Sequence, residues 1–267
     1  MLYEGIKGVP DFTCDEYEEK KRKYVLLIPI INEGNRIHKE LMRAKKYGVS
    51  KFVDIVICDA GSTDGCTDEK KLRHLEVNTL LVKKGPGKQG AQLRMGFWWA
   101  KQRGYDGILT IDGNNKDSIE DVTKMIAKLQ EGYDLVQGSR FIRGGRAINT
   151  PFVRWLSVNL IHAPIISITA RQRFTDTTNN FRAYSARYLF SERVQVFRDI
   201  FMTYELLAYL SVRATQIGMR ACEVPVTRAY PKKGKVPTKI SFFKGNSDLM
   251  KILFANLLGK YNPKESV

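Results

Sequence analysis

The fold is decided by one stretch, Ile108-Leu109-Thr110-Ile111-Asp112-Gly113-Asn114-Asn115-Lys116-Asp117. Its first four residues have the apolar and β-branched character of a buried strand, and a turn rich in carboxylate and amide groups follows at once. A second stretch has the same form, since the apolar run Ile55-Val56-Ile57-Cys58 leads into Asp59-Ala60-Gly61-Ser62-Thr63-Asp64-Gly65. The carboxyl ends of parallel strands meet at one crevice in an open α/β sheet. The two turns therefore predict a polar, acidic site at one edge of a parallel sheet.

Strands and helices are expected to alternate on both sides of these stretches. Apolar runs predict strands at residues 24–29, 53–58, 79–83, 107–111, 135–138, 181–184 and 222–226. Apolar residues at helical spacing predict helices at 36–47, 64–75, 91–103, 122–129, 204–217 and 246–258. Such alternation is typical of a single α/β domain with a mostly parallel sheet flanked by helices.

The composition indicates an anionic partner and a reducing compartment. The net charge is +16 over 267 residues, which attracts phosphorylated ligands, nucleic acid or an anionic membrane. The four cysteines have no paired spacing, which argues against a disulfide framework or a structural zinc site. No apolar secretory signal precedes residue 24. The expected location is the cytoplasm, including the inner face of the membrane.

One apolar segment, residues 155–170, has two interpretations. Asn159, His162 and Pro164 interrupt it, and it is shorter than the roughly 20 residues that span a bilayer, so no transmembrane helix is predicted. A helix in the protein core is the favoured interpretation. The alternative is a helix that lies at a membrane surface.

The turn after Ile111 carries the candidate metal ligands. Asp112 is the first choice, with Asn114 and Asp117 as helpers, because carboxylate and amide oxygens suit Mg²⁺ or Mn²⁺. The plainer alternative is that Asp112 only begins a turn and caps a helix.

Three motifs occur in the order of successive strand–helix units. They are Pro29-x-x-Asn32-Glu33, Asp59-x-Gly61-Ser62-x-Asp64-Gly65 and Asp112-Gly113-Asn114. In this order they resemble the family-two glycosyltransferases with the GT-A fold, and the chain is similar to the branch that transfers glucose or mannose to polyprenyl (dolichyl) phosphate. The resemblance covers about residues 24–258. It implies a GT-A, Rossmann-like fold with a mostly parallel sheet.

The resemblance implies a nucleotide-sugar site at the ends of the strands. Asp59 would accept hydrogen bonds from the base or the ribose, and the loop and helix that begin at Lys88 would approach the nucleotide. The full set of donor-binding residues expected in this way is Pro29, Asn32, Glu33, Asp59, Gly61, Ser62, Lys88, Arg94, Asp112, Gly113 and Arg140.

The metal motif departs from the family pattern. The family has Asp-x-Asp, whereas this chain has Asp112-Gly113-Asn114, so the site loses one negative charge. Asn114 can still offer a carbonyl oxygen to a cation. The expected cofactor is Mg²⁺ or Mn²⁺ held by Asp112 and Asn114, while the requirement for a metal is left open.

The resemblance also assigns residues to the acceptor side. The segment Asp176-Thr177-Thr178-Asn179-Asn180-Phe181-Arg182 and Tyr204-Glu205 match the places where the family binds its acceptor. If the acceptor is a hydroxyl, Asp176 or Glu205 would take its proton, whereas a phosphate acceptor needs no strong base. The residues expected at the diphosphate or the acceptor phosphate are Arg182, Arg228, Lys235 and Lys239, and residues 235–239 are expected to close as a lid.

The leading hypothesis is an inverting transfer of a hexose from a UDP- or GDP-sugar to a polyprenyl phosphate at the cytoplasmic membrane surface. A second hypothesis keeps the donor but takes a saccharide or a hydroxymethylated DNA base as acceptor, although the sequence carries no recognisable nucleic-acid module. A third is a non-catalytic binder of sugar nucleotides or polyanions. The expected division is a polar extension at 1–23, a catalytic domain at 24–258 with its acceptor side at about 145–258, and a tail at 259–267.

Overall fold

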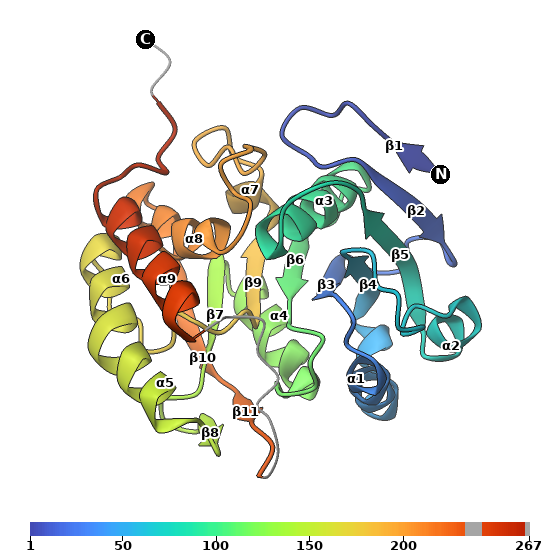
Figure 1. The fold of residues 1–267 in the computed structure, drawn as a ribbon, viewed down its shortest axis with the longest axis horizontal. Helices are drawn as coiled ribbons and strands as arrows, with labels where there is room; N and C mark the ends of the chain where they lie inside the picture. The colour runs from blue at the N-terminus through green and yellow to red at the C-terminus, as the bar shows by residue number, and fades with distance from the viewer. Residues whose placement is uncertain (233–241, 265–267) are drawn as a thin grey trace.

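The structure, a computed structural model, describes residues 1–232 and 242–264 (Figure 1). Its strands are β1 (Leu2–Tyr3), β2 (Phe12–Glu16), β3 (Tyr24–Ile30), β4 (Val53–Asp59), β5 (Val77–Lys83), β6 (Gly107–Thr110), β7 (Leu135–Ser139), β8 (Arg146–Ile148), β9 (Arg182–Ser185), β10 (Ala221–Pro225) and β11 (Thr227–Ala229). Its α-helices are α1 (Asn35–Lys46), α2 (Glu69–His74), α3 (Gln89–Gln102), α4 (Val122–Gln130), α5 (Phe152–Ser157), α6 (Ala163–Ala170), α7 (Ala186–Leu189), α8 (Glu205–Gln216) and α9 (Phe242–Leu257). Short 3₁₀-helices cover Val49–Lys51 and Ile119–Asp121, and a π-helix, Val158–His162, joins α5 to α6.

A nine-stranded mixed sheet has the order β1-β2-β5-β4-β3-β6-β9-β7-β10. Its centre, β5-β4-β3-β6, is parallel, while β9 runs antiparallel between β6 and β7. Strands β8 and β11 form a separate parallel pair. This arrangement confirms the expected α/β fold with a parallel sheet at its centre.

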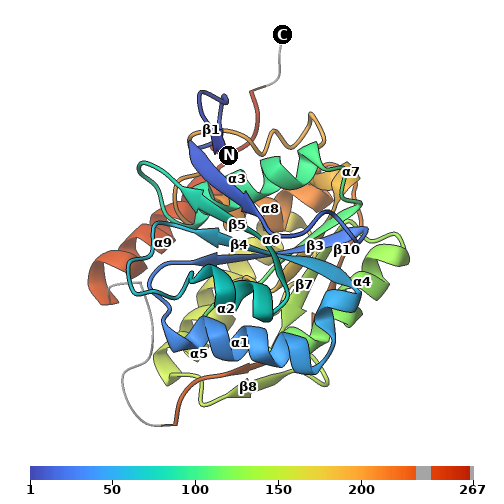
Figure 2. The same ribbon diagram turned by 90° about the vertical axis from the view of Figure 1, so that its right-hand side faces the viewer.

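Successive residues of β3 point to opposite faces of the sheet, as in any strand. Leu27 lies in one buried cluster with Phe97 of α3, while Ile28 lies in the other with Leu41 of α1 and Met125 of α4. Figure 2 shows α3 and α8 on one side of the sheet and α1 and α2 on the other. Helices therefore cover both faces, which explains why the central strands are mostly apolar on both faces.

The register of the parallel strands brings the two acidic turns together. Ile30 at the end of β3 pairs with Asp59 at the end of β4, and β6 pairs with the other edge of β3. The turn after β6 approaches β3 so closely that a Cβ at Gly113 would overlap the side chain of Ile30. Gly113 therefore fits where a larger residue would displace Asp112.

The first 23 residues were expected to be a polar extension, but they contribute to the sheet. Strand β2 pairs antiparallel with β5, and Phe12 is fully buried in the cluster that contains Leu27. Phe12 also stacks on Tyr3 with ring centroids 4.8 Å apart. The polar composition of this segment conceals the side chains that pack on the core, Tyr3 from β1 and Phe12 and Cys14 from β2.

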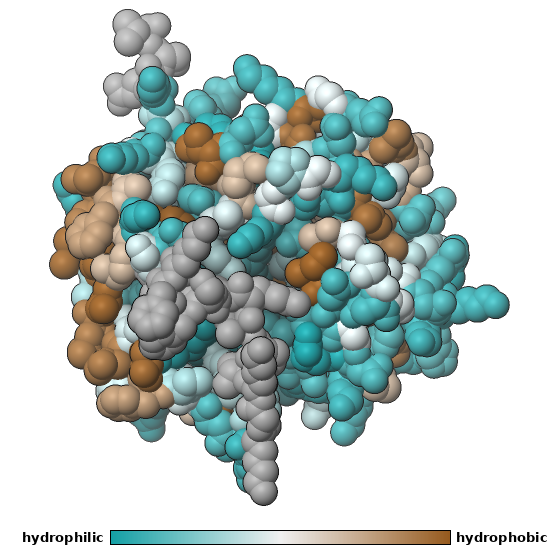
Figure 3. All heavy atoms as spheres, viewed as in Figure 1, coloured by the Kyte–Doolittle hydropathy of each residue, from teal (hydrophilic) through white to brown (hydrophobic). Residues whose placement is uncertain are grey.

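The segment Phe152–Ala170 is not the core helix that was favoured from the sequence. Its inner side chains, such as Val158 and Ile166, are buried, but its outer face is exposed, with Phe152 72%, Leu160 64% and Ile168 70% accessible. By length and composition alone, these 19 residues are sufficient to cross a membrane, contrary to the expectation that no segment is. Figure 3 shows apolar side chains gathered on this side of the molecule.

Candidate functional site

Asp112 is the centre of the site, directly beyond β6. Gln89 Nε2 donates to its Oδ1 at 3.0 Å, and Arg228 Nη2 donates to its Oδ2 at 3.0 Å. Asn114 Nδ2 lies 3.4 Å from the same Oδ2. Burial acts to raise the pKa of Asp112, but Arg228 and Lys116 outweigh it and hold that pKa below its ordinary value. Asp112 is therefore a carboxylate at neutral pH.

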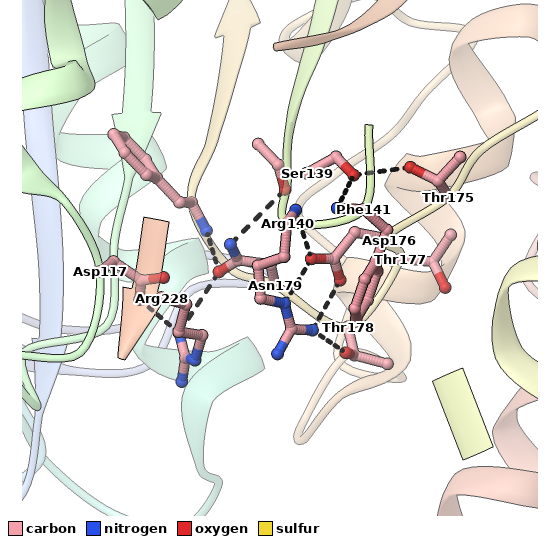
Figure 4. Close-up of polar contacts among 12 residues, drawn as sticks. Asp117, Ser139, Arg140, Phe141, Thr175, Asp176, Thr177, Thr178, Asn179 and Arg228 are labelled. Carbon is pink, nitrogen blue, oxygen red and sulfur yellow. Dashed lines mark hydrogen bonds and ion pairs between the residues drawn. The ribbon is translucent and has the colours of Figure 1, made fainter. Parts of the chain in front are cut away.

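Arg228 joins Asp112 to Asp117. Figure 4 shows Arg228 beside Asp117 and Asn179. Its Nη1 donates to Asp117 Oδ2 and lies 3.3 Å from Asn179 Oδ1. Asp117 is fully buried, and burial raises its pKa to about 6 even though Arg228 acts in the opposite direction. Burial acts to lower the pKa of Arg228, but Asp117 and Asp112 raise it overall, so the guanidinium stays charged.

Side chains of helix α1 fix the turn between Asp112 and Asp117 through hydrogen bonds. Asn115 adopts a left-handed conformation with φ of 57°, which asparagine tolerates better than most residues. Its N–H donates to Glu40 Oε2 at 2.8 Å, and Arg43 donates to its Oδ1 at 3.2 Å and to the carbonyl of Asp117 at 3.1 Å. Burial raises the pKa of Glu40 well above its ordinary value. The turn is thus fixed by side chains from a helix more than 60 residues earlier in the chain.

The oxygen atoms beside Asp112 fit a hard divalent cation. The carbonyl oxygen Oδ1 of Asn114 is buried and accepts no hydrogen bond from the residues that the structure describes. Within residues 1–232 and 242–264, no three His, Cys, Asp or Glu side chains are grouped as metal ligands. One carboxylate and one amide oxygen suffice for a cation such as Mg²⁺, which usually takes its remaining ligands from water and substrate phosphates. Asp112 and Asn114 would hold it.

The turn after β4 forms the neighbouring rim. Asp59 accepts from the N–H groups of Gly61 at 3.0 Å and Ser62 at 2.8 Å, and from Ser62 Oγ at 2.5 Å. Asn32, which follows β3, is hydrogen-bonded to the turn after β4. Its N–H donates to Ser62 Oγ at 2.8 Å, and its Oδ1 accepts from Thr63 N–H at 2.8 Å. These residues, expected from two separate motifs, form one connected surface.

Other residues expected at the nucleotide occupy different environments. Pro29 lies within β3, Glu33 pairs with Arg36 at 2.7 Å, and Lys88 is exposed at the start of α3. Arg94 differs from the expectation. Its side chain is almost fully buried and donates to the carbonyl of Gly8 at 2.5 Å, so in this conformation it secures the N-terminal segment.

Arg140 and Asp176 form a buried ion pair (Figure 4). Arg140 Nε donates to Asp176 Oδ2 at 2.6 Å, Nη2 donates to Oδ1 at 2.8 Å, and Nη2 also donates to Thr178 Oγ1 at 3.1 Å. Asp176 has no exposed surface. In place of the open position expected for a proton acceptor, Asp176 holds Arg140 and joins the end of β7 to the segment before β9.

Two more acceptor-side residues are also engaged by the protein itself. Arg182 is fully buried and donates to the carbonyl of Leu207 at 2.7 Å and to Ser211 Oγ at 2.9 Å, so its guanidinium does not face a ligand. Glu205, in the first turn of α8, accepts from Thr203 N–H at 2.6 Å and from Thr203 Oγ1 at 2.7 Å. Lys235 and Lys239, and the expected lid at 235–239, lie outside the described residues.

A cationic group around Tyr230 was missed from the sequence. Arg154 Nη1 donates to the Tyr230 hydroxyl at 3.2 Å, and Lys116 Nζ lies 5.0 Å from the centre of its ring. The guanidinium of Arg228 lies 5.9 Å from the same centre. Burial raises the pKa of Tyr230, but Arg228 and Arg154 outweigh it, so that pKa is lowered overall. Two signals were available in the sequence: the lone cation Arg154 in an apolar run, and the spacing of Arg228 and Tyr230, which places both on one face of an extended chain.

Comparisons with known proteins bear on the relatives and the fold of this chain. No family model matches the sequence. The chain is 26% identical over 212 residues to the polyprenol monophosphomannose synthase of Mycolicibacterium smegmatis, covering 77% of each chain. It is 27% identical over 208 residues to the undecaprenyl-phosphate mannosyltransferase of Micrococcus luteus, covering 77% of this chain and 83% of that protein.

A solved structure extends the likeness to the fold. The glucosyl-3-phosphoglycerate synthase of Mycobacterium tuberculosis, crystallised with Mn²⁺, UDP and phosphoglyceric acid, superposes with a TM-score of 0.60. The match covers 91% of this chain and 80% of that one at 16% identity, which bears on the fold alone. The chain has the GT-A fold and resembles the family-two glycosyltransferases, as its motifs indicate.

Proposed function

We propose that the chain transfers a hexose from a UDP- or GDP-sugar to a polyprenyl phosphate at the cytoplasmic surface of a membrane, with inversion at the sugar. One observation carries the choice of acceptor. The short helix α5 turns Phe152 and Trp155 to solvent, while Arg154 of the same helix points to Tyr230 beside the Asp112 site. An apolar exterior next to a buried cationic group matches an acceptor with an apolar chain and an anionic head.

The chemistry requires stabilisation of a departing diphosphate. An oxygen of the acceptor phosphate attacks C1 of the hexose, the bond from C1 to the donor diphosphate breaks, and its electron pair leaves with the nucleoside diphosphate. A divalent cation, Mg²⁺ or Mn²⁺, at Asp112 and Asn114 would neutralise part of that charge. Arg228 and Lys116 add fixed positive charge at the same place, and a preorganised cation stabilises charge that develops during the reaction.

The engaged carboxylates favour a phosphate acceptor over a hydroxyl. A hydroxyl must lose its proton to a base, but Asp176 is buried against Arg140 and both oxygens of Glu205 are bound by Thr203. A phosphate monoester is already an anionic nucleophile near neutral pH and needs no such base. A saccharide or a hydroxymethylated base is therefore the weaker candidate.

The membrane part of the proposal rests on exposed apolar side chains of α5, α6 and α9. Ile168 of α6 and Leu257 of α9 line one surface hollow together with Arg171. Phe254 and Leu258 line a second hollow. This second hollow also includes the basic residues Lys251 and Lys260. Apolar side chains bordered by cations are suited to the interface of an anionic membrane.

Transfer is tested with the purified full chain, a panel of UDP- and GDP-hexoses, and polyprenyl phosphate in vesicles. We expect one donor to release its nucleoside diphosphate and to label the lipid, with no product from the corresponding polyprenol. Thermal shift with each nucleotide shows separately whether the donor binds. A donor that binds without any transfer to lipid phosphate would exclude this acceptor.

Membrane binding is tested by sedimentation with vesicles. We expect the chain to bind vesicles that contain anionic lipid, and Trp155→Glu to weaken that binding about tenfold through loss of apolar burial. The exposed residue Met42 of α1, on another surface, offers the matched control Met42→Glu. An equal loss in both variants would contradict the assigned surface.

A further inference from the structure

The guanidinium of Arg228 lies where it can neutralise both acids of the turn after β6. It binds Asp112 through Nη2 at 3.0 Å and Asp117 through Nη1. Its backbone is fixed to the same turn, because Ser118 N–H donates to the carbonyl of Thr227 at 2.9 Å and Ala229 N–H donates to that of Lys116 at 2.8 Å. Arg228 is thus a built-in cation of this turn.

Both oxygens of the Asp112 carboxylate already accept hydrogen bonds in this arrangement. Its Oδ1 accepts from Gln89, and its Oδ2 accepts from Arg228 with the Asn114 amide nitrogen 3.4 Å away. A cation between Asp112 and Asn114 needs the carbonyl oxygen of Asn114 to face it, so the amide must turn. It must also share the Asp112 carboxylate with the guanidinium of Arg228.

We propose that Arg228 competes with the divalent cation for Asp112, and that the cation binds tightly only when the donor diphosphate draws Arg228 away from that carboxylate. This rests on the proposed use of a nucleotide-sugar donor. Two cations a few ångströms apart repel each other strongly in a site of low dielectric constant. A diphosphate relieves the repulsion, because guanidinium groups bind phosphate oxygens through paired hydrogen bonds.

The replacement of a second carboxylate by Asn114 makes the competition effective. A carboxylate at position 114, in addition to Asp112 and Asp117, would let the turn hold a guanidinium and a metal ion at once. With Asp112 as the one acid next to Asn114, either cation can satisfy it, while Asp117 keeps Arg228 close by. The departure from the Asp-x-Asp pattern and the position of Arg228 therefore have a common explanation.

The test measures Mn²⁺ binding to the full chain by the electron paramagnetic resonance signal of free Mn²⁺, with and without UDP or GDP. We expect the nucleotide to tighten Mn²⁺ binding by about tenfold or more, and Mn²⁺ to tighten nucleotide binding by the same factor, because coupling is reciprocal. In Arg228→Gln we expect Mn²⁺ alone to bind about tenfold more tightly and the coupling to fall.

Arg43→Gln is the matched control. Arg43 binds the same turn through the side chain of Asn115 and the backbone carbonyl of Asp117. It contacts neither the Asp112 carboxylate nor the Asp117 carboxylate. An equal gain in Mn²⁺ affinity in Arg43→Gln would mean that general charge, not competition, is responsible and would overturn the proposal. So would Mn²⁺ binding to the unmodified chain that is equally tight with and without nucleotide.

Two further measurements keep the outcome clear. Circular dichroism reports whether Arg228→Gln folds, and Arg228→Lys keeps one charge but cannot bind both acids, so an intermediate Mn²⁺ affinity is expected. If no nucleotide binds to the chain by thermal shift, the proposed function fails. The competition itself is still decided by Mn²⁺ binding to the Arg228 variants alone, where an unchanged affinity contradicts it.

Discussion

The part of the chain before residue 141 and the part after residue 144 build their polar groups in different ways. In the first, Asp59 is bound by N–H groups two and three residues away, within its own turn. In the second, Arg228 reaches Asp112, 116 residues earlier, and Asp176 is buried against Arg140. The first part positions its acids through sheet topology, whereas polar groups of the second part are positioned by ion pairs with the first part.

This difference has an energetic consequence. The backbone at the end of a parallel strand keeps its position when an acidic side chain there is replaced, because the sheet determines that position. A buried ion pair is different, since removal of one partner leaves the other charged and desolvated. Substitution of an acid at a strand end, such as Asp112, should therefore reduce activity more than stability, and loss of Arg140 from its fully buried pair with Asp176 should do the reverse.

The largest expected effect is that of Asp112→Ala on transfer. Loss of this carboxylate removes the anchor for the cation and for Arg228, and we expect a fall in kcat/KM of at least about 100-fold to 1,000-fold. Arg228 keeps Asp117 as a partner, so the fold should persist. Initial rates and circular dichroism measure the two quantities, and turnover equal to that of the unmodified chain would remove Asp112 from the mechanism.

Arg140→Gln should affect stability first. It leaves the Asp176 carboxylate buried without its partner, which costs about 3–5 kcal/mol in the free energy of unfolding. Urea denaturation measures this cost. Lys21→Gln breaks an exposed pair with Glu18 and should cost less than about 1 kcal/mol. A similarly small loss in Arg140→Gln would imply that Asp176 is not held by Arg140 in solution, and the role of proton acceptor would reopen.

The same contrast explains what could be predicted from the sequence. The central strands and the acidic turns were predictable because apolar runs that end in Asp59 and Asp112 follow local rules. The burial of Arg182 was not, because the carbonyl of Leu207 and the hydroxyl of Ser211 that bind it belong to a later helix. The burial of Phe152–Ala170 was predicted wrongly, because an apolar composition does not show which side chains pack against the rest of the protein.

Other features were not predicted from the sequence for the same physical reason. Nothing in the sequence near Arg154 indicates Tyr230, 76 residues later. Lys116 lies in the turn after β6, but its sequence neighbours do not indicate that it contacts the ring of Tyr230. The N-terminal strands were missed because a strand of two to five residues gives too short a pattern.

A smaller effect is expected where the second part meets the acceptor. Arg154→Gln removes one charged donor beside Tyr230, and hydrogen bonds to charged groups contribute about 1.5–3 kcal/mol, so KM for polyprenyl phosphate should rise about 10-fold to 100-fold. Binding of the donor, measured by thermal shift, should be unchanged. Arg73→Gln is the control, as Arg73 is exposed in α2, away from the surface formed by α5, α6 and α9. Equal changes in KM for both variants would mean that Arg154 acts only through surface charge.

The smallest effect concerns pH and tests how well the second part excludes water. Burial, assisted by Arg154, lowers the pKa of His162 to about 4, whereas an unfolded chain titrates near its ordinary 6.5. Between these values the unfolded state binds more protons, so acidification favours unfolding and the stabilising contribution is present above pH 6.5. From pH 7.5 to 5, the unmodified chain should lose on the order of 1 kcal/mol more than His162→Gln, as read from urea midpoints. Equal losses would mean that His162 is charged in the folded chain and that water reaches the π-helix around it. The distinction between a buried inner face and an exposed outer face of this segment would then be weaker.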